Sequence, residues 1–497
     1  MFGTEMSRVE ELIAKASGMA SKALTIGVST GIAAYDLEPL LKQVYPVLAP
    51  FRNEHLPRRV STIGGTALNA KRLLSIAPSG GGMGIAEGLR GGLISVVEQD
   101  FSAFYRTIGQ EANLSFEAED QAEGFDDARA IRTTSLLNSN LMEEERLVLF
   151  GNGGNVSIAG SSAQTALGTP AAAPVLTNNG GATGTVAAAT YYVWVVALTY
   201  QGLRNASVAG GVPIQTTRTN ADGSTTTTNG GSSNVSAASN SVTLAAPGSL
   251  AATVAAVPGA WGYAWFVGTA KASAYLAAVT QVNTMVLTAP AAGTQVATAI
   301  TADNSIDSYV FDGLITQVQQ VGSGSYVKSL DGANLTSNGA GGITQIDAAL
   351  TSMYTNYKLD PEVMFLDSGT AQYANYRVMS GGGAPLFRFN IDGKQGGVDV
   401  IGNSQVGSYI NPITKRLIKM IVHPWFPQGT IFICSKTLPY QTPNVPVPYR
   451  LQARVKDWQE FEWPIVTRQR VHGQYLTAAL VSYAPFAHGL LQNVGQG

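Results

Sequence analysis

The sequence predicts an α+β chain that is interrupted by an inserted all-β domain, and three observations predict it. First, residues 151–305 hold only five charged residues, whereas the rest of the chain holds the other 59. Second, this charge-poor block contains short segments that alternate between apolar and polar residues, with no helical periodicity. Third, the flanking residues mix helical and strand patterns. A separate domain inserted into another fold explains this contrast in composition.

Overall charge and length exclude some classes of protein. The 497 residues include 31 Lys+Arg and 33 Asp+Glu, which gives a net charge of −2, so no bulk attraction to nucleic acid or to an anionic membrane is expected. Charged residues make up 13% of the chain, against about 25% in typical soluble domains. A surface with so little charge is either neutral and polar or covered by other chains, which is a first indication of an assembly.

The single cysteine, Cys434, excludes a disulfide framework and a cysteine-based metal cluster. Its apolar neighbours predict a small buried strand residue. Three glutamates lie among the first eleven residues, with no basic region followed by an apolar run, so no secretory signal is expected. The most apolar uncharged stretch, 186–200, is shorter than the roughly 20 residues of a membrane-spanning helix. We therefore expect no contact with a membrane.

The N-terminal third of the chain divides into an arm and a long hairpin. Residues 1–51 are interpreted as an N-terminal arm and residues 52–116 as an extended loop. Within this loop, 58–63 and 68–76 resemble strands, Gly80–Gly84 resembles a mobile tip, and 92–97 resembles a return strand. A two-stranded ribbon is marginally stable alone in water, so we expect it to lie on another surface.

The strongest helix signal covers residues 117–150, which form either one long helix or two helices broken near Gly124. Six carboxylates lie at its start: Glu117, Glu119, Asp120, Glu123, Asp126 and Asp127. Acidic residues at a helix N-terminus complement the positive end of the helix dipole. Such a cluster could in principle bind a divalent cation, but an acidic end that faces solvent or a partner is the favoured interpretation.

The inserted block, 151–305, is predicted to be an antiparallel β-sandwich. Its strands are expected at 190–199, 240–244, 261–268, 274–279 and 283–287. Trp194 and either Trp261 or Trp265 are candidate core residues, because one face of each strand must be dry. Residues 220–224 predict a flexible hairpin tip.

The remaining residues are predicted to form a central α+β domain, 306–448, and a C-terminal β segment, 449–497. Helices are expected at 342–354 and 368–379, and strands at 362–366, 415–423 and 430–434. Residues 475–483 are apolar on both faces, which predicts a fully buried strand.

No active site emerges from the sequence. There is no phosphate-binding glycine loop and no metalloprotease helix, and the four histidines lie singly, without metal-ligand spacing. Residues 27–31 match a nucleophile elbow around Ser29, but the strand that should precede it is missing. We therefore expect no enzyme activity, no cofactor and no metal. A hydrolase that uses Ser29 is a remote alternative.

The order of these parts resembles the major capsid proteins of tailed bacteriophages. The matching phrases are 311–316, 343–366, 427–432 and the ending 483–489. The inserted block is similar to fibronectin type III and immunoglobulin-like sandwiches, through 191–198, 257–263 and 275–279, although its strand order looks rearranged.

The resemblance implies a protein that self-assembles into hexamers and pentamers of an icosahedral head enclosing phage DNA. It implies homo-oligomerisation, scaffolding, portal and decoration proteins as partners, non-specific contact with DNA, and a place in the virion after assembly in the bacterial cytoplasm. Extended loops of this family lie over neighbouring subunits. A basic set and an acidic set are expected to pair between subunits: Arg58, Arg59, Lys71 and Arg72 with Glu117, Glu119, Asp120 and Asp126. The alternative is a secreted or tail-associated adhesin or decoration protein built on β-sandwiches.

Overall fold

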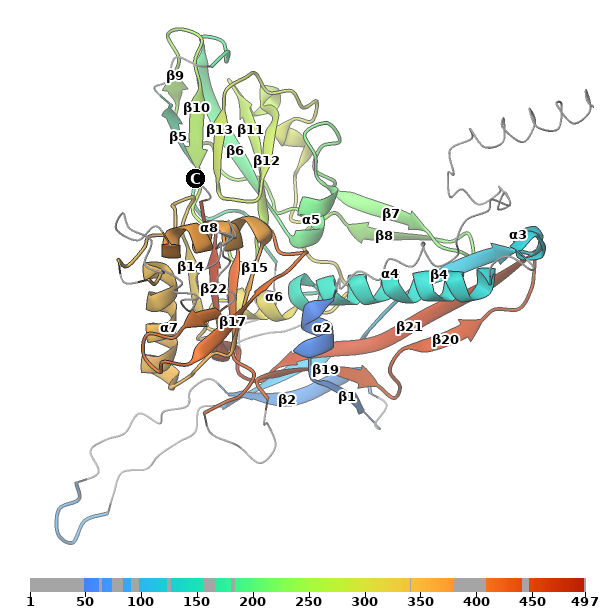
Figure 1. The fold of residues 1–497 in the computed structure, drawn as a ribbon. Coiled ribbons are helices and arrows are strands. Elements are labelled where there is room, and N and C mark those ends of the chain that lie inside the picture. The colour runs from blue at the N-terminus through green and yellow to red at the C-terminus, as the bar shows by residue number, and fades with distance from the viewer. Residues whose placement is uncertain are drawn as a thin grey trace, which may run out of the picture. The chain divides into compact units, whose positions relative to one another are not determined.

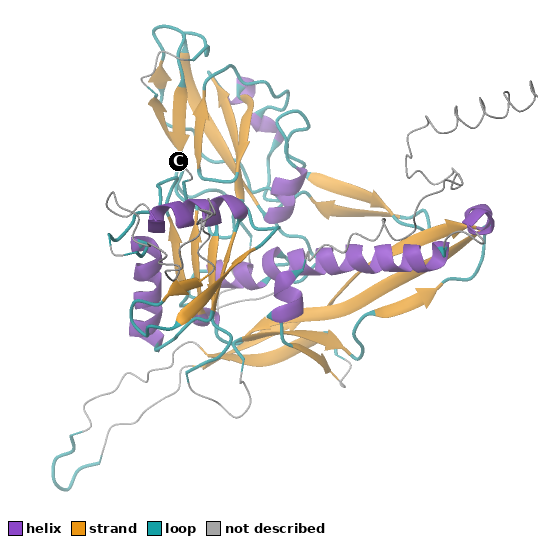
Figure 2. Cartoon of the chain, in the orientation of Figure 1, coloured by secondary structure: helices purple, strands orange, loops and turns teal. Residues whose placement is uncertain are grey.

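The computed structural model describes residues 49–61, 65–73, 84–90, 98–122, 127–154, 166–179, 184–339, 341–379, 408–439 and 447–495. These residues divide into two compact units. Figures 1 and 2 show the helices and strands. The described part of the first unit comprises 109–122, 127–142 and 458–475, and the second unit holds the other described residues. Most of the predicted arm and tip, the return strand, Ser29, Glu123 and Asp126 lie outside the described residues.

The first unit contains a β-hairpin and the N-terminal part of a long helix. Strand β20 (Gln459–Glu462) runs antiparallel to the first half of β21 (Gln469–Ser482), which also pairs with β4 (Arg106–Ser115). The predicted 117–150 helix is two helices, α3 (Phe116–Ala122) and α4 (Ala128–Phe150). Asp127 begins α4, because its carboxylate accepts a hydrogen bond from the Ala130 backbone N–H at 3.0 Å.

In the second unit, the second half of β21 pairs with β19 (Tyr449–Arg454), and β1 (Arg58–Ser61) extends this sheet in parallel with β19. The predicted strand 58–63 pairs with β19 and not within the ribbon, and the predicted return strand, 92–97, lies outside the described residues. A two-stranded ribbon is formed instead by β2 (Ala67–Leu73) and β3 (Glu98–Phe104). It does not stand free at its base. Apolar side chains of β3, Phe101 and Ala103, pack with Ala479, Val481 and Tyr483 of the same chain, since the alternating pattern of the ribbon gives it one apolar face.

The inserted block folds as two sheets that share one core, with almost no helix (Figure 2). One sheet has the order β13-β10-β5 and the other β12-β11-β6-β9. Their bounds are β5 Val175–Asn178, β6 Thr190–Leu198, β9 Val242–Thr243, β10 Leu250–Thr253, β11 Gly262–Gly268, β12 Tyr275–Thr280 and β13 Thr284–Leu287. The five predicted strands match β6, β9, β11, β12 and β13. Trp194, Trp261 and Trp265 are all buried.

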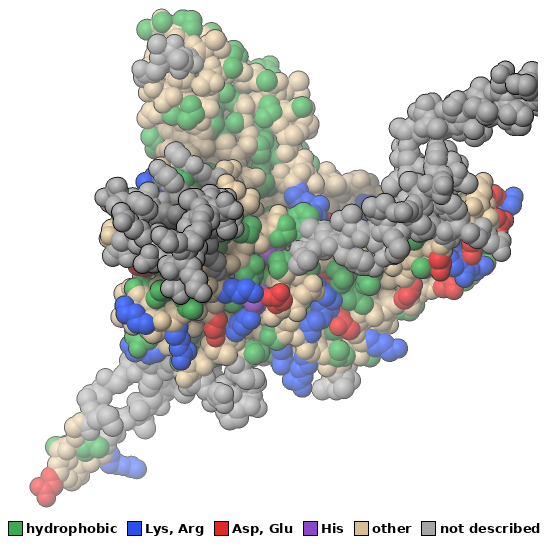
Figure 3. All heavy atoms as spheres, in the orientation of Figure 1, with side chains coloured by type: hydrophobic (Ala, Val, Ile, Leu, Met, Phe, Trp, Pro, Cys, Tyr) green, Lys and Arg blue, Asp and Glu red, His purple; other side chains and the backbone are tan. Residues whose placement is uncertain are grey.

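Two short additions complete the block. A separate hairpin joins β7 (Gln215–Thr219) to β8 (Thr225–Asn229) through the predicted tip. A short helix, α5 (Tyr200–Asn205), follows β6 and begins at Thr199, whose side-chain oxygen accepts a hydrogen bond from the Gly202 N–H. Figure 3 shows the low charge of the block, because its visible surface at the top carries hardly any blue or red.

A mixed six-stranded sheet forms the central part of the second unit, in the order β14-β22-β18-β15-β17-β16. Its strands are β14 Tyr326–Ser329, β15 Val363–Leu366, β16 Ser408–Ile410, β17 Leu417–Val422, β18 Ile431–Cys434 and β22 His488–Gln492. The helices of this region are α6 Leu314–Gln319, α7 Thr344–Tyr357 and α8 Ser368–Met379. The predicted helices and strands are thus confirmed, and Cys434 is a buried residue of β18. Among the described residues, no helix is both long and apolar enough to span a membrane.

Candidate assembly surfaces

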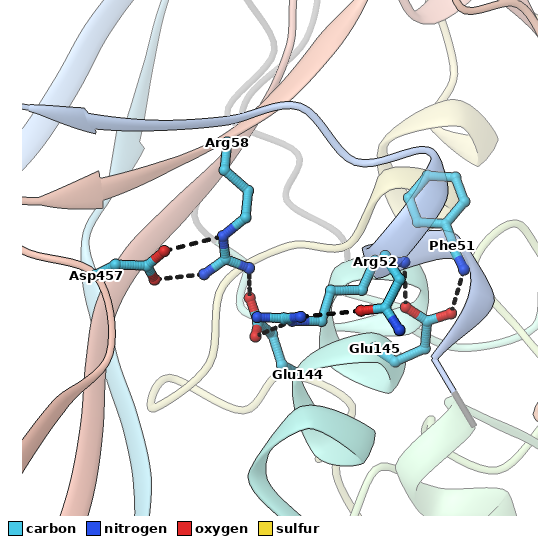
Figure 4. A network of polar contacts seen from close by, with 7 residues as sticks. Phe51, Arg52, Arg58, Glu144, Glu145 and Asp457 are labelled. Carbon is cyan, nitrogen blue, oxygen red and sulfur yellow. Dashed lines mark hydrogen bonds and ion pairs between the residues drawn. The ribbon is translucent and has the colours of Figure 1, made fainter. Parts of the chain in front are cut away.

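The C-terminal part of α4 is tied to the short helix α2 (Pro50–Glu54) by a buried carboxylate (Figure 4). Glu145 accepts hydrogen bonds from the backbone N–H groups of Phe51 at 2.8 Å and Arg52 at 2.7 Å, which are first-turn donors that a helix leaves unpaired. The His423 Nε2–H donates to the same carboxylate at 2.7 Å, while its Nδ1 accepts from the Trp425 N–H at 3.3 Å. One neutral tautomer of His423 therefore satisfies both contacts.

The neighbouring carboxylate, Glu144, is fully buried between two arginines (Figure 4). Arg52 Nε lies 2.8 Å from it, and Arg58 donates to its other oxygen. Arg58 also binds Asp457, with 3.2 Å between Nε and Oδ2. Burial opposes the charge of Arg58, but Asp457 and Glu144 outweigh it and raise the pKa of the guanidinium. Arg58, a predicted intersubunit residue, is thus engaged within its own chain.

Arg72 is also used inside the chain, at the base of the ribbon. Its side chain is completely buried, with Nε donating to the Ser482 carbonyl and Nη2 to Gln317 Oε1, both at 2.9 Å. The guanidinium carbon lies 4.6 Å from the centre of the Phe101 ring. Burial lowers the pKa of Arg72 to about 10, against the opposing charge of Asp312. Arg59 and Lys71 are exposed, so these two are the predicted basic residues on the surface.

In the first unit, the acidic helix start faces arginines that the sequence analysis did not single out. Glu117 forms an ion pair with Arg468 at 2.9 Å. Glu119 forms ion pairs with Arg470 at 3.2 Å and with Arg129 at 2.7 Å. Arg470 lies on β21, and Arg468 comes directly before that strand.

Asp120 differs from these carboxylates. It is exposed, and no ion pair joins it to a residue within the described ranges. With Phe116, Glu119 and the three arginines it lines an open cleft of about 620 Å³. The predicted pairing of Glu117, Glu119, Asp120 and Asp126 with another subunit remains a prediction.

Two stretches expose large apolar side chains, and the sequence analysis missed both. Every residue from Gly84 to Arg90 is exposed, including Ile85 at 58% and Leu89 at 70%. In the first unit, β20 and the residues after it expose Phe461, Trp463, Ile465 and Val466. The alternation of apolar residues at 461, 463 and 465 was the available signal. Exposed apolar clusters of this kind mark surfaces that bind other molecules.

Among the described residues, no three His, Cys, Asp or Glu side chains are grouped as metal ligands would be. Two histidines are buried instead. Desolvation lowers the pKa of His488 to about 3, and desolvation together with the charge of Lys436 lowers that of His55 to about 4.

No protein-family model and no curated protein matches this sequence. Solved structures that are similar to it over most of its length include capsid and phage structures. A chain of the capsid of a native GTA particle is 8% identical, with a TM-score of 0.39, over 96% of this chain and 98% of the other. A chain of the capsid of Myoviridae phage XM1 is 9% identical, with a TM-score of 0.37, over 94% of this chain and 100% of the other. A chain of a structure of Mycobacterium phage Bobi is 7% identical, with a TM-score of 0.40, over 95% of this chain and 97% of the other.

Proposed function

We propose that this chain is a major capsid protein that self-assembles into hexamers and pentamers of an icosahedral head enclosing DNA. The observation that carries the proposal is the 84–90 segment, which lies beyond the β2–β3 ribbon and is exposed at every residue. Burying Ile85 and Leu89 against a neighbouring chain would stabilise that contact. A subunit built to overlap its neighbours needs such a segment, whereas a monomeric enzyme does not.

The partners in this proposal are other copies of the chain, together with scaffolding, portal and decoration proteins and non-specific contact with packaged DNA. The virion is the proposed location, after assembly in the bacterial cytoplasm, and the role is structural rather than enzymatic. Between subunits, the proposed charge contacts use Arg59, Lys71 and Asp120, which are exposed. Arg58 and Arg72 support them from inside the subunit.

The test is assembly of the purified full-length protein, followed by light scattering and electron microscopy, alone and with the products of neighbouring phage genes. We expect capsomers or shells from the natural chain. A variant with Ile85→Ser and Leu89→Ser should remain folded and lose most of its assembly, because its exposed apolar contacts are gone. Val321→Ser is the matched control, since Val321 is 85% exposed outside this segment. A protein that stays a monomer in every mixture would contradict the proposal.

A further inference from the structure

The β7–β8 hairpin of the inserted block forms a small sheet of its own. Within the described residues the two strands pair only with each other, so each strand has one open edge. Seven of their ten residues are threonines. Figure 2 shows the pair extending away from the two sheets of the block. A two-stranded ribbon is marginally stable alone in water, so a further strand would stabilise it.

The turn that joins the two strands holds the hairpin in one shape. The Asn220 N–H donates to the Ser224 carbonyl at 2.8 Å, and the Ser224 N–H donates to the Asp222 carboxylate at 2.9 Å. Gly223 has a φ of +82°, which glycine adopts without strain. The Asn220 side chain also donates to the Thr226 hydroxyl at 2.8 Å. A segment that is ordered before it binds loses less conformational freedom on binding.

Alternate residues of β8 direct their backbone polar groups away from β7. The Gly230 N–H donates to the Ile214 carbonyl at 2.8 Å, and Thr217 lies opposite Thr227 three pairs further along the ladder. Hydrogen-bonded and non-hydrogen-bonded pairs alternate in an antiparallel ladder, so the N–H and C=O groups of Thr217 and Thr227 point outward. No backbone hydrogen bond joins Thr227 to another segment that the structure describes.

The charges of the hairpin distinguish its two edges. Arg218 lies on β7 and is exposed, whereas β8 consists of four threonines and an asparagine and has no charge. Native proteins use a charge on an edge strand to prevent the addition of another strand. Threonine, in contrast, is enriched in strands. The β7 edge is therefore protected, and the β8 edge is open.

We propose that β8 pairs antiparallel with β8 of a second copy of this chain across a two-fold axis beside Thr227, an inference that rests on the proposed function. In this register the N–H and C=O groups of Thr227 bind those of Thr227 in the second copy. The product is a four-stranded sheet with Arg218 on both outer strands. Those charges oppose the addition of further strands, so the contact closes at two copies.

The chemistry of β8 favours a second copy as the partner. Pairing β8 with itself places threonine opposite threonine, a favourable cross-strand pair, and buries no charge. The same contact through β7 would bring two copies of Arg218 onto neighbouring strands, where like charges repel. An assembly of many copies also presents one hairpin to another at high effective concentration.

The first experiment removes one outward N–H from each edge in turn. Thr227→Pro acts on β8, and Thr217→Pro is the matched control on β7. Both positions are exposed, and both variants lose the same hydroxyl contact, which is 3.1 Å between Thr217 and Thr227. Proline is tolerated at outward-facing positions of edge strands, so both variants should keep the natural circular dichroism spectrum. In Thr227→Pro alone, the concentration needed for half-maximal assembly should rise about threefold or more, because a strand-pairing hydrogen bond is lost.

The second experiment places charges at the two-fold axis. Thr227→Lys and Thr227→Glu should each impair assembly, because like charges then lie directly opposite each other. An equal mixture of the two variants should recover assembly, since a lysine of one copy then faces a glutamate of the other. Thr217→Lys puts the same charge on the β7 edge and should leave assembly unchanged.

The third experiment detects the contact directly with Thr227→Cys. Hydrogen-bonded partners in an antiparallel ladder have Cα atoms about 5.5 Å apart, a separation that a disulfide spans. The natural cysteine, Cys434, is buried. With a mild oxidant added to the assembled protein, we expect a reducible dimer of Thr227→Cys on a non-reducing gel and none of Thr217→Cys.

The outcomes separate this inference from the proposed function. If the natural chain assembles and Thr227→Cys gives no more dimer than Thr217→Cys, or Thr227→Pro assembles like the natural chain, this inference alone fails. Dimers of Thr217→Cys alone would assign the contact to β7 and overturn it as well. If the natural chain forms no assembly, the proposed function fails. In that case a dimer of Thr227→Cys still supports the hairpin contact, and its absence refutes both.

Discussion

Two adjacent glutamates on α4, Glu143 and Glu144, differ in how deeply their side chains are buried. Glu144 is fully buried and held by Arg52 and Arg58, whereas the side chain of Glu143 is 35% exposed and pairs with Arg146 and Arg204. A buried ion pair is costly to break, because the remaining charge stays without its partner in a medium of low polarity. An exposed pair is screened by water and contributes little.

We therefore predict that Glu144→Gln lowers the free energy of unfolding by about 3 kcal/mol, measured by urea denaturation followed by circular dichroism. The control, Glu143→Gln, should change it by less than about 1 kcal/mol. Equal losses in the two variants would show that burial does not separate the two carboxylates.

At the scale of elements, the last turn of α4 is joined to the inserted block by an aromatic cluster. Phe150 is stacked on Tyr200 at 4.3 Å between ring centres and meets Trp261 edge-on at 4.8 Å and Phe426 at 5.4 Å. Stacked and edge-to-face rings of this kind contribute beyond their buried area. The helix α5 and the 424–428 turn therefore depend on the same side chain.

Removing this ring should weaken the second unit strongly. Phe150→Ala is expected to cost about 3–5 kcal/mol, the usual range for deleting a buried aromatic side chain, in a urea unfolding experiment. Tyr200→Phe keeps the stacked ring and should cost under about 1.5 kcal/mol. If the Phe150→Ala variant unfolds at the same urea concentration as the natural chain, the aromatic cluster does not stabilise the junction.

For the whole molecule, the buried histidines predict how stability depends on pH. The folded pKa values of His55 and His488 lie near 4 and 3, below the value of about 6.5 in an unfolded chain. Between these values the unfolded chain binds more protons than the folded one. Stability is therefore complete above about pH 6.5 and falls as the solution is acidified toward the folded pKa values.

We expect the melting temperature to fall steadily from pH 6.5 to pH 5, a window in which few carboxylates titrate. His488→Gln should flatten this slope, and His55→Gln should flatten it as well, because each variant removes one buried imidazole whose pKa is lowered. Differential scanning fluorimetry in a series of buffers provides the measurement. A melting temperature that rises on acidification would contradict the sign of this argument.

Local periodicity was enough to predict most elements of the central part and of the insert. The alternation at 261–268 matches β11, and the helical spacing at 343–354 matches α7, because both patterns arise among residues close in sequence. The charge contrast marked the insert for the same reason, since composition needs no knowledge of the fold. The sequence predicted that the insert is a β-sandwich with a core between two sheets. Its similarity to immunoglobulin-like domains remains a prediction.

The sequence by itself thus determined the order of the elements, the all-β character of the insert and the presence of opposite charges in two regions. Only the tertiary structure decided how those charges are used. Arg58 meets Asp457 across 399 positions and Arg72 meets Ser482 across 410, while Arg59, between them in sequence, stays exposed. The physical reason is strand register: a shift of one residue turns a side chain from the core to the surface, and pairing partners far along the chain set that register.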